Sequence, residues 1–245
     1  ARPTESPAPE PGRLRFNGSH DPAVALIAAQ AGEIFPGLTF EISYTGSLGG
    51  LMALAQGKAD LSGCHLWDEE SDTYNIPFVH KLLPGRQAWL VTLAHRRVGL
   101  ITPPGNPTQL SGLADLVRPG LRFVNRNPGS GTRVWLDAQL KRIGLAGSQV
   151  NGYEREKATH YEVAQAVAEG AADTGLGIEA AALSFGLGFT LLTTEAYQLV
   201  IPAEKWPLPA IQALVKWLQS PSTQTAINSL GGYDTTSTGK TTWLS

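Results

Sequence analysis

The chain has 245 residues, of which 42% are hydrophobic and 16% charged, and its formal net charge is −2. These values are typical of a globular chain with room for one large or two modest α/β domains. A charge so close to zero argues against broad attraction to nucleic acid or to an anionic membrane. The single cysteine, Cys64, excludes an internal disulfide, and no apolar run approaches the ~20 residues that span a bilayer.

Residues 1–13 are expected to form a Pro-rich linker or tether. Four prolines fall within the first twelve residues, and no apolar periodicity is present there. The sequence begins without a methionine or the apolar core of a signal peptide, so we expect a processed N-terminus or a segment of a longer protein. Such a Pro-rich N-terminal segment suits both a tether that follows a removed signal peptide and a linker to an upstream domain.

The first half of the chain is predicted to alternate short strands with helices. Residues 14–16 predict a strand, and Asp21 followed by Pro22 predicts the start of a helix, since Asp is a good N-cap and Pro suits the first helical position. Further strands are expected at residues 39–44 and 60–64, a helix between them ending at Gly57, and two separate β-rich runs at 87–93 and 98–102.

A Pro-rich break at residues 103–107 is followed by a second series of elements. Thr159 and Glu162 have the spacing of a capping box, which predicts a helix start. The other expected elements are strands at 121–124, 151–154, 172–176 and 197–201, and helices at 134–143, 178–185, 209–219 and from 220 onward.

A unit of strand, hydroxyl-bearing turn and helix therefore recurs in both halves. This alternation predicts mainly parallel sheets covered by helices, with ligands bound outside the carboxyl ends of the strands. We expect two doubly wound α/β lobes joined by two crossover strands, near residues 94–98 and 195–198. Lobe I would comprise residues 14–95 and 198–245, and lobe II would comprise residues 96–197.

The turn at residues 125–133 is the clearest candidate for a binding site. Gly129, Ser130 and Gly131 lie between a predicted strand and a predicted helix. The first amides of such a helix are unpaired, and with the helix dipole they favour an anion. The alternative is that Ser130 only caps the helix and the glycines only allow the turn.

Several short motifs, in this order, resemble the type II periplasmic-binding-protein superfamily. Within it, the sequence is similar to the PBP-like domain that is related to molybdate- and tungstate-binding proteins and is often fused to a helix-turn-helix domain. The resemblance extends from Leu14 to Gly232, and the motifs that carry it are Gly18-Ser19-His20-Asp21, residues 63–66 with 74–78, residues 125–133, residues 152–156 with 159–160, and residues 173–178.

The resemblance implies a small oxyanion held by hydroxyl and amide donors from both lobes. The positions that match are Ser19, Ser47, Ser130 with Gly131 and Thr132, and Thr159. Neutral donors suit a dianion such as molybdate, tungstate or sulfate, because each makes a charge-assisted hydrogen bond. Such donors would disfavour a protonated anion, whose hydroxyl needs an acceptor.

Two histidines and two arginines extend this candidate site. Arg126 and Arg133 lie in the turn, where Arg133 either reaches the anion or pairs with an acidic side chain one turn along the helix. His20 and His65 follow predicted strands and are either ligand contacts or structural histidines. A histidine that contacts the anion would make the affinity depend on pH.

The expected function is non-catalytic binding, with no cofactor and no metal. The sequence has no Gly-x-Ser-x-Gly elbow, no P-loop lysine and no zinc-ligand spacing. The favoured role is a cytoplasmic ligand-sensing domain of a transcriptional regulator, with a DNA-binding domain upstream and no nucleic-acid contact of its own. The alternatives are an extracytoplasmic receptor that delivers the oxyanion to an ABC transporter, and a binder of a small organic anion, which Trp67 and Tyr74 would contact.

Overall fold

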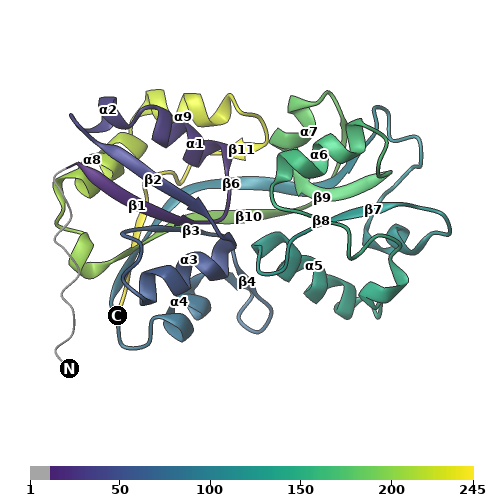
Figure 1. Ribbon diagram of the computed structural model, residues 1–245, viewed down its shortest axis with the longest axis horizontal. Coiled ribbons are helices and arrows are strands. Elements are labelled where there is room, and N and C mark those ends of the chain that lie inside the picture. Colours follow the sequence, from purple (N-terminus) through teal and green to yellow (C-terminus); the bar gives the residue numbers. More distant parts are fainter. Residues whose placement is uncertain (1–11) are drawn as a thin grey trace.

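Two long antiparallel strands connect the two lobes of the protein, as seen in a computed structural model that describes residues 12–245 (Figure 1). These strands are β6 (Ala88–Thr102) and β10 (Gly188–Pro202), and they pair along their whole length, with Arg96 opposite Glu195. Both predicted crossing points lie within them. The predicted linker falls outside the described residues except at its end, where Arg13 already belongs to β1.

The first lobe combines the N-terminal third of the chain with its C-terminal end (Figure 1). Its strands are β1 (Arg13–Gly18), β2 (Thr39–Tyr44), β3 (Ser62–Cys64), β4 (Trp67–Asp68), β5 (Thr73–Tyr74), β11 (Tyr233–Asp234) and β12 (Thr241–Leu244). Its helices are α1 (Pro22–Ala29), α2 (Ala31–Ile34), α3 (Gly46–Ala55), α4 (Ile76–Leu82), α8 (Pro209–Leu218) and α9 (Pro221–Asn228). β1 pairs with β2 in parallel, and β3 pairs with β10.

The second lobe is built on the other halves of β6 and β10. Its remaining elements are β7 (Phe123–Arg126), α5 (Gly131–Arg142), β8 (Glu156–Lys157), α6 (His160–Ala168), β9 (Thr174–Ile178) and α7 (Glu179–Ser184). β9, β7 and β8 run parallel to one another, and β9 joins β6 antiparallel. The carboxyl ends of β7 and β9 therefore lie at one edge of the sheet, next to the first lobe.

Local sequence signals explain where several helices begin. Asp21 caps α1 by accepting a hydrogen bond from the amide of Ala23 at 2.7 Å, and Pro22 occupies the first helical position. The capping box of Thr159 and Glu162 opens α6, as predicted. In α8 the side chains of Ile211, Leu214 and Leu218 are fully buried in the core of the first lobe.

The structure corrects two strand predictions. The runs at 87–93 and 98–102 form the single strand β6, because Arg96 between them is buried against carboxylates instead of lying in a loop. Residues 151–154 form a turn, and the strand follows at Glu156–Lys157. Gly152 has a φ of +98°, and a Cβ there would lie 2.0 Å from the carbonyl oxygen of Phe123, so only glycine fits this close approach.

The sheets also contain more antiparallel pairing than expected. β3, β10, β6 and β9 are neighbours in that order, and each neighbouring pair is antiparallel. The parallel pairs predicted from the strand–helix alternation occur away from the crossover strands. β6 and β10 are antiparallel because they connect the lobes in opposite directions, and β9 and β3 then pair antiparallel with them. Among residues 12–245, no helix is long and apolar enough to cross a bilayer.

Candidate functional site

A buried ion-pair network lies where the two crossover strands pass between the lobes. Arg96 on β6 donates through Nε to Glu195 on β10 at 2.6 Å, and its Nη1 pairs with Asp21 before α1. Tyr233 donates its hydroxyl to Asp21 at 3.0 Å. The side chains of Arg96, Asp21 and Glu195 are at most 2% exposed. The charge of Arg96 is therefore compensated within the protein, and its two carboxylate partners leave this Arg96 network with one net negative charge.

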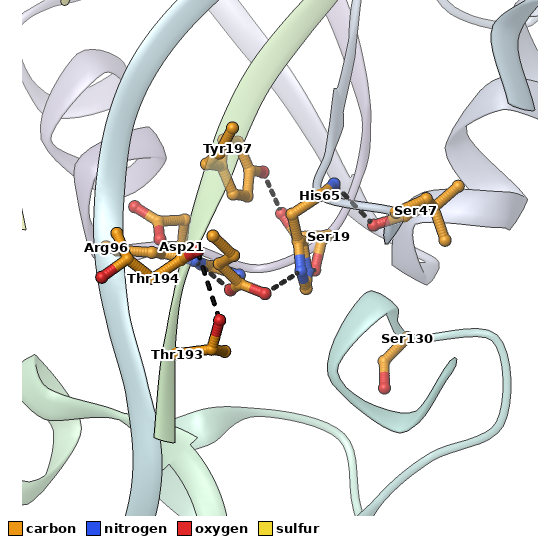
Figure 2. A network of polar contacts seen from close by, with 12 residues as sticks. Ser19, Asp21, Ser47, His65, Arg96, Ser130, Thr193, Thr194 and Tyr197 are labelled. Atoms are coloured by element: carbon orange, nitrogen blue, oxygen red, sulfur yellow. Dashed lines mark hydrogen bonds and ion pairs between the residues drawn. The ribbon is translucent and has the colours of Figure 1, made fainter. Parts of the chain in front are cut away.

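Ser19 and His65 extend the network toward the second lobe (Figure 2). His65 Nδ1 lies 2.9 Å from Glu195 Oε2, and its Nε2 lies 2.8 Å from Ser19 Oγ. The amide of His65 donates to Ser47 Oγ at 3.3 Å, and the hydroxyl of Tyr197 donates to the Ser19 carbonyl at 2.5 Å. Three residues of the predicted site, Ser19, Ser47 and His65, thus meet at the ends of β1 and β3.

Burial and the neighbouring charges determine the ionisation of this network. Burial alone would raise the pKa of Glu195, but Arg96 and His65 outweigh it and lower that pKa to about 2. Burial lowers the pKa of His65, and the carboxylate of Glu195 offsets only part of that shift. Near neutral pH, the site therefore holds an ionised Glu195 beside a neutral His65.

A second set of buried polar side chains comes from the second lobe and lacks partners. Arg126 at the end of β7 donates through Nε to the carbonyl of Lys157 at 3.3 Å and through Nη2 to that of Ala158 at 2.8 Å. Its Nη1, the hydroxyl of Thr132 and both ring nitrogens of His160 are buried without a hydrogen-bond partner in the part of the chain that the structure describes. Arg126, Thr132 and His160 are called the unpartnered cluster below.

The unpartnered cluster is positively charged. Burial and the nearby charge of Arg96 lower the pKa of Arg126 to about 10, which leaves its guanidinium charged near neutral pH. Burial, followed by the charges of Arg126 and Arg96, lowers the pKa of His160 well below its usual value. Buried polar groups without hydrogen bonds, beside a cation that forms no ion pair among residues 12–245, are costly by themselves. They are favourable where an anion binds.

The turn before α5 packs directly against the first lobe. A Cβ on Gly131 would lie 2.5 Å from the carbonyl oxygen of His65 and 2.6 Å from its Nδ1. A Cβ on Gly46 in α3 would lie 3.1 Å from the carbonyl oxygen of Gly129. The cleft between the lobes is therefore closed at this point, and the first amides of α5 lie beside His65.

The hydroxyls of Ser130 and Thr159 act as helix caps. Ser130 Oγ accepts from the amide of Arg133 at 3.3 Å, and Thr159 Oγ1 accepts from that of Glu162 at 3.1 Å. In Figure 2, Ser130 stands on the turn before α5, outside the drawn chain of contacts. At the start of α6 it is the next residue, His160, that is fully buried.

Arg133 is held by its own lobe. Its Nε donates to Asp137 one turn along α5 at 3.0 Å, and its guanidinium lies 3.9 Å from the ring centre of Tyr153. These contacts favour the pairing alternative for Arg133. His20 sits edge-on between Tyr44 of the first lobe and Tyr161 of the second, with ring centres 4.8 and 5.9 Å away.

Sequence reasoning missed Arg96, Glu195, Asp21 and His160 as parts of the site. Arg96 was placed between two strands, although His95-Arg96-Arg97 contains none of the Gly, Pro, Asn or Asp residues that mark a turn. That absence was the available signal. The pairing of Arg96 with Glu195 joins residues 99 positions apart, which no local pattern reveals.

Two further features bear on possible ligands. No group of three or more His, Cys, Asp and Glu side chains within residues 12–245 is arranged to hold a metal ion. A cavity of about 320 Å³ opens between the lobes, and its lining includes Trp67, Tyr74, Trp135 and Arg142. Thr194, next to Glu195 on β10, also lines it.

Comparison with known proteins identifies relatives and a shared fold. YvgK, an uncharacterized protein of Bacillus subtilis (strain 168), is 37% identical over 197 residues, and the match spans 80% of this chain and 63% of YvgK. A putative phosphate ABC transporter substrate-binding protein from Clostridium perfringens, solved with bound phosphate, has a TM-score of 0.66 at 13% identity and covers 90% of this chain and 98% of its own. The sulfate-binding protein SubI from Mycobacterium tuberculosis H37Rv has a TM-score of 0.63 at 20% identity, and the match covers 90% of this chain and 86% of SubI.

The identities of 13% and 20% to these two solved structures establish the two-lobed fold alone. Residues 28–219 match the family model described as a PBP superfamily domain, and the chain therefore belongs to the PBP-like family.

Proposed function

We propose that this chain binds a small tetrahedral oxyanion in the closed cleft between its lobes. The observation that carries the proposal is the unpartnered cluster. Arg126 is 1% exposed, and its Nη1 has no hydrogen-bond partner among residues 12–245. The hydroxyl of Thr132 and the ring nitrogens of His160 are also buried and also lack hydrogen-bond partners in that range. A bound anion would satisfy these donors and compensate the charge of Arg126.

The first turn of α5 supports the same ligand. Its N-terminal amides have no partner within the helix, and the helix dipole adds positive potential at that end. Gly131 brings these amides against His65 because it has no Cβ. Ser19 and Ser47 lie on the opposite side of the contact, next to His65. The donors of the proposed site thus come from both lobes.

Two proteins of similar fold bind ligands of this class. The C. perfringens protein contains phosphate, and SubI is a sulfate-binding protein. Molybdate and tungstate, which the sequence resemblance implies, are tetrahedral oxyanions as well. We therefore include all four anions in the proposed ligand class.

Calorimetric titration with phosphate, sulfate, molybdate and tungstate tests the proposal. At least one anion should bind with a dissociation constant well below millimolar. Arg126→Met should weaken that binding about 10- to 100-fold, since a hydrogen bond to a charged group contributes about 1.5–3 kcal/mol. Arg118→Met, at an exposed arginine of the same lobe, is the matched control and should bind normally. If no anion binds below millimolar, or if both variants bind equally well, the proposal is wrong.

We infer a sensing role for the bound anion, with delivery to an ABC transporter as the alternative. The chain spans 63% of YvgK, so more than a third of that relative lies outside the match and has room for another domain. Closure of the lobes around a ligand is a movement that an attached DNA-binding domain or a transporter permease could detect. The sequence upstream distinguishes the roles: a helix-turn-helix indicates the sensor, and a signal peptide with a lipidation cysteine indicates the receptor.

A second candidate function is hydrolysis, because Ser19, His65 and Glu195 form a hydrogen-bonded Ser–His–carboxylate chain. We favour binding without catalysis, since Ser19 is 0% exposed and Glu195 is also engaged by Arg96. Incubation with activated esters and phosphate esters tests this preference. Turnover that Ser19→Ala abolishes and Ser47→Ala retains would establish an enzyme.

An organic anion is a variant of the same binding function. The cavity lined by Trp67, Tyr74 and Trp135 has room for an apolar group beside the cleft. A ligand of this kind would lose affinity in Trp135→Ala, whereas an inorganic anion would bind that variant normally. Titration of the variant with an inorganic anion and with a phosphorylated hydroxy acid distinguishes the two.

A further inference from the structure

The neighbours of Ser19 fix the direction of its hydroxyl proton. Glu195 is ionised and can only accept, so the proton of a neutral His65 lies on Nδ1, which faces Glu195 at 2.9 Å. His65 Nε2 is then a bare acceptor. In the 2.8 Å bond between Ser19 Oγ and His65 Nε2, the serine must therefore be the donor.

Ser19 consequently presents only lone pairs to a ligand. A hydroxyl-bearing ligand can donate to these lone pairs, whereas a fully deprotonated oxyanion is repelled by them. The other acceptors nearby are engaged: Asp21 accepts from Arg96 and Tyr233, and Glu195 accepts from Arg96 and faces His65. Within the Arg96 network, Ser19 Oγ is thus an acceptor left for a ligand proton. Outside this network, the neutral His160 also has one accepting ring nitrogen without a hydrogen-bond partner among residues 12–245.

The charges around His65 determine what a dianion would do there. The charged groups that act on the pKa of His65 are Glu195 from β10, Arg96 from β6 and Arg126 from β7. The charges of His65 and His20 both act on His160 of α6, and Asp21 before α1 pairs with Arg96. The Tyr197 ring stacks on His65 at 5.7 Å. Two guanidinium groups are matched by two carboxylates, so sulfate and hydrogen phosphate, both dianions in mildly alkaline solution, leave the same excess negative charge beside the imidazole.

The two anions therefore differ at Ser19. Hydrogen phosphate donates its proton to the Ser19 lone pairs and leaves Ser19 donating to an unprotonated Nε2, whereas sulfate has no such proton, and its lone pairs face those of Ser19 until His65 is protonated.

We propose that the Ser19–His65–Glu195 chain selects the protonation state of the oxyanion. A hydroxyl-bearing oxyanion such as hydrogen phosphate binds directly and donates its hydrogen bond to Ser19 Oγ. A fully deprotonated oxyanion such as sulfate binds together with one solvent proton, which His65 accepts on Nε2. The Nε2–H group then donates to Ser19 Oγ, and the Ser19 hydroxyl turns to donate to the anion. The inference rests on the proposed oxyanion site.

Proton uptake measured by calorimetry in two buffers of different ionisation enthalpy tests this selection in the wild-type chain. The titrants are sulfate and phosphate in the mildly alkaline range, where sulfate carries no proton and phosphate carries one. Binding of sulfate should be accompanied by the uptake of about one proton per anion bound, and the affinity for sulfate should fall about tenfold for each unit that the pH rises. Hydrogen phosphate should bind without proton uptake and with a flat pH profile over the same range.

A matched pair of histidine variants identifies the group that takes the proton. His65→Gln should remove both the proton uptake and the pH slope of sulfate binding. His80→Gln, on the exposed face of α4, should retain both. Far-UV circular dichroism checks that His65→Gln is folded, and the wild-type measurement does not depend on that variant.

The outcomes separate this inference from the proposed function. If neither anion binds, both fail together. If sulfate and hydrogen phosphate bind with the same proton uptake, or with none, the oxyanion site stands and the selection by Ser19 and His65 is wrong. Uptake that persists unchanged in a folded His65→Gln variant would also overturn the assignment.

Discussion

Arg96 and Arg126 are both buried in the same region, yet their surroundings are opposite. Burial alone would lower the pKa of Arg96, but the charges of Glu195 and Asp21 outweigh it and raise that pKa. Arg126 forms no ion pair within the described chain, and burial together with the charge of Arg96 lowers its pKa to about 10. One guanidinium is thus compensated by the fold. The other keeps its charge and one free donor for a ligand.

The same contrast extends to the residues around each arginine. The Arg96 network connects Ser19, His65 and Asp21 by hydrogen bonds and ion pairs within the protein. Arg96 Nη2 lacks a well-directed hydrogen bond, but it lies 2.6 Å from Glu195 Oε1 and so has a carboxylate beside it. The unpartnered cluster of Arg126, Thr132 and His160 has buried donors with nothing to contact among residues 12–245. We infer that the first set is preorganised, whereas the second is completed by the anion.

Replacing each arginine by methionine should produce the largest difference. Arg96→Met leaves Asp21 and Glu195 as uncompensated buried charges and should lower the free energy of unfolding by about 3–5 kcal/mol. Arg126→Met removes a buried charge that forms no ion pair, at the loss of two hydrogen bonds to carbonyls, so the ligand-free protein should lose much less stability than Arg96→Met does. Urea unfolding of both variants measures this, and equal losses would contradict the comparison.

Gly131→Ala should keep the lobes apart and thereby weaken anion binding. The added Cβ meets His65 at 2.5–2.7 Å, and overpacking of this kind costs about 1–3 kcal/mol, so anion affinity should fall roughly tenfold or more. Stability without ligand should change little, because the open form has no clash. Gly32→Ala in α2, where a Cβ meets no atom within 4 Å, is the control and should bind normally.

Ser130→Ala should separate capping from ligand binding. Ser130 caps α5 as Ser220 caps α9, each accepting from an amide at 3.3 Å, so either substitution should cost about 1 kcal/mol of stability. If Ser130 also contacts the anion, only Ser130→Ala should lose affinity as well. Calorimetry and urea unfolding of the two variants decide this, and identical behaviour would make Ser130 a cap alone.

Acidification should lower the free energy of unfolding gradually, through several buried histidines at once. Burial lowers the pKa of His20, His65 and His160 below the usual value of about 6.5, so below about pH 6.5 the unfolded chain binds more protons than the folded one. The stabilisation is complete above that pH. It falls as the pH drops toward the folded-state values, by at most about 1.4 kcal/mol per pH unit for each histidine. Urea unfolding at several pH values checks the sign, and a gain in stability on acidification would contradict it.

Local signals in the sequence predicted much of the fold. The Asp21–Pro22 start of α1, the capping box of α6 and the amphipathic face of α8 depend on residues within one or two turns, and all three are present. The continuity of β6 was missed because charged residues between two apolar runs were interpreted as a loop. It becomes buried only because Glu195, 99 residues later, lies opposite it.

The candidate site was predictable only in part for the same reason. Hydroxyls at strand-to-helix turns led to Ser19 and Ser47, which do lie together beside His65. Whether a hydroxyl donates to a ligand depends on its own partners, which the sequence does not reveal. Ser19 is the clearest case: the sequence suggests a donor for deprotonated anions, whereas the bond to His65 makes it an acceptor while that histidine is neutral.

Anomalous diffraction from crystals soaked with arsenate would show where a tetrahedral oxyanion binds in this protein. Arsenate is a tetrahedral, hydroxyl-bearing oxyanion with a strong anomalous signal. We expect a single peak within hydrogen-bond distance of Arg126 Nη1 and the first amides of α5, with Ser19 at its other side. Well-measured data with no peak at Arg126, or with a peak only at surface arginines such as Arg118, would contradict it.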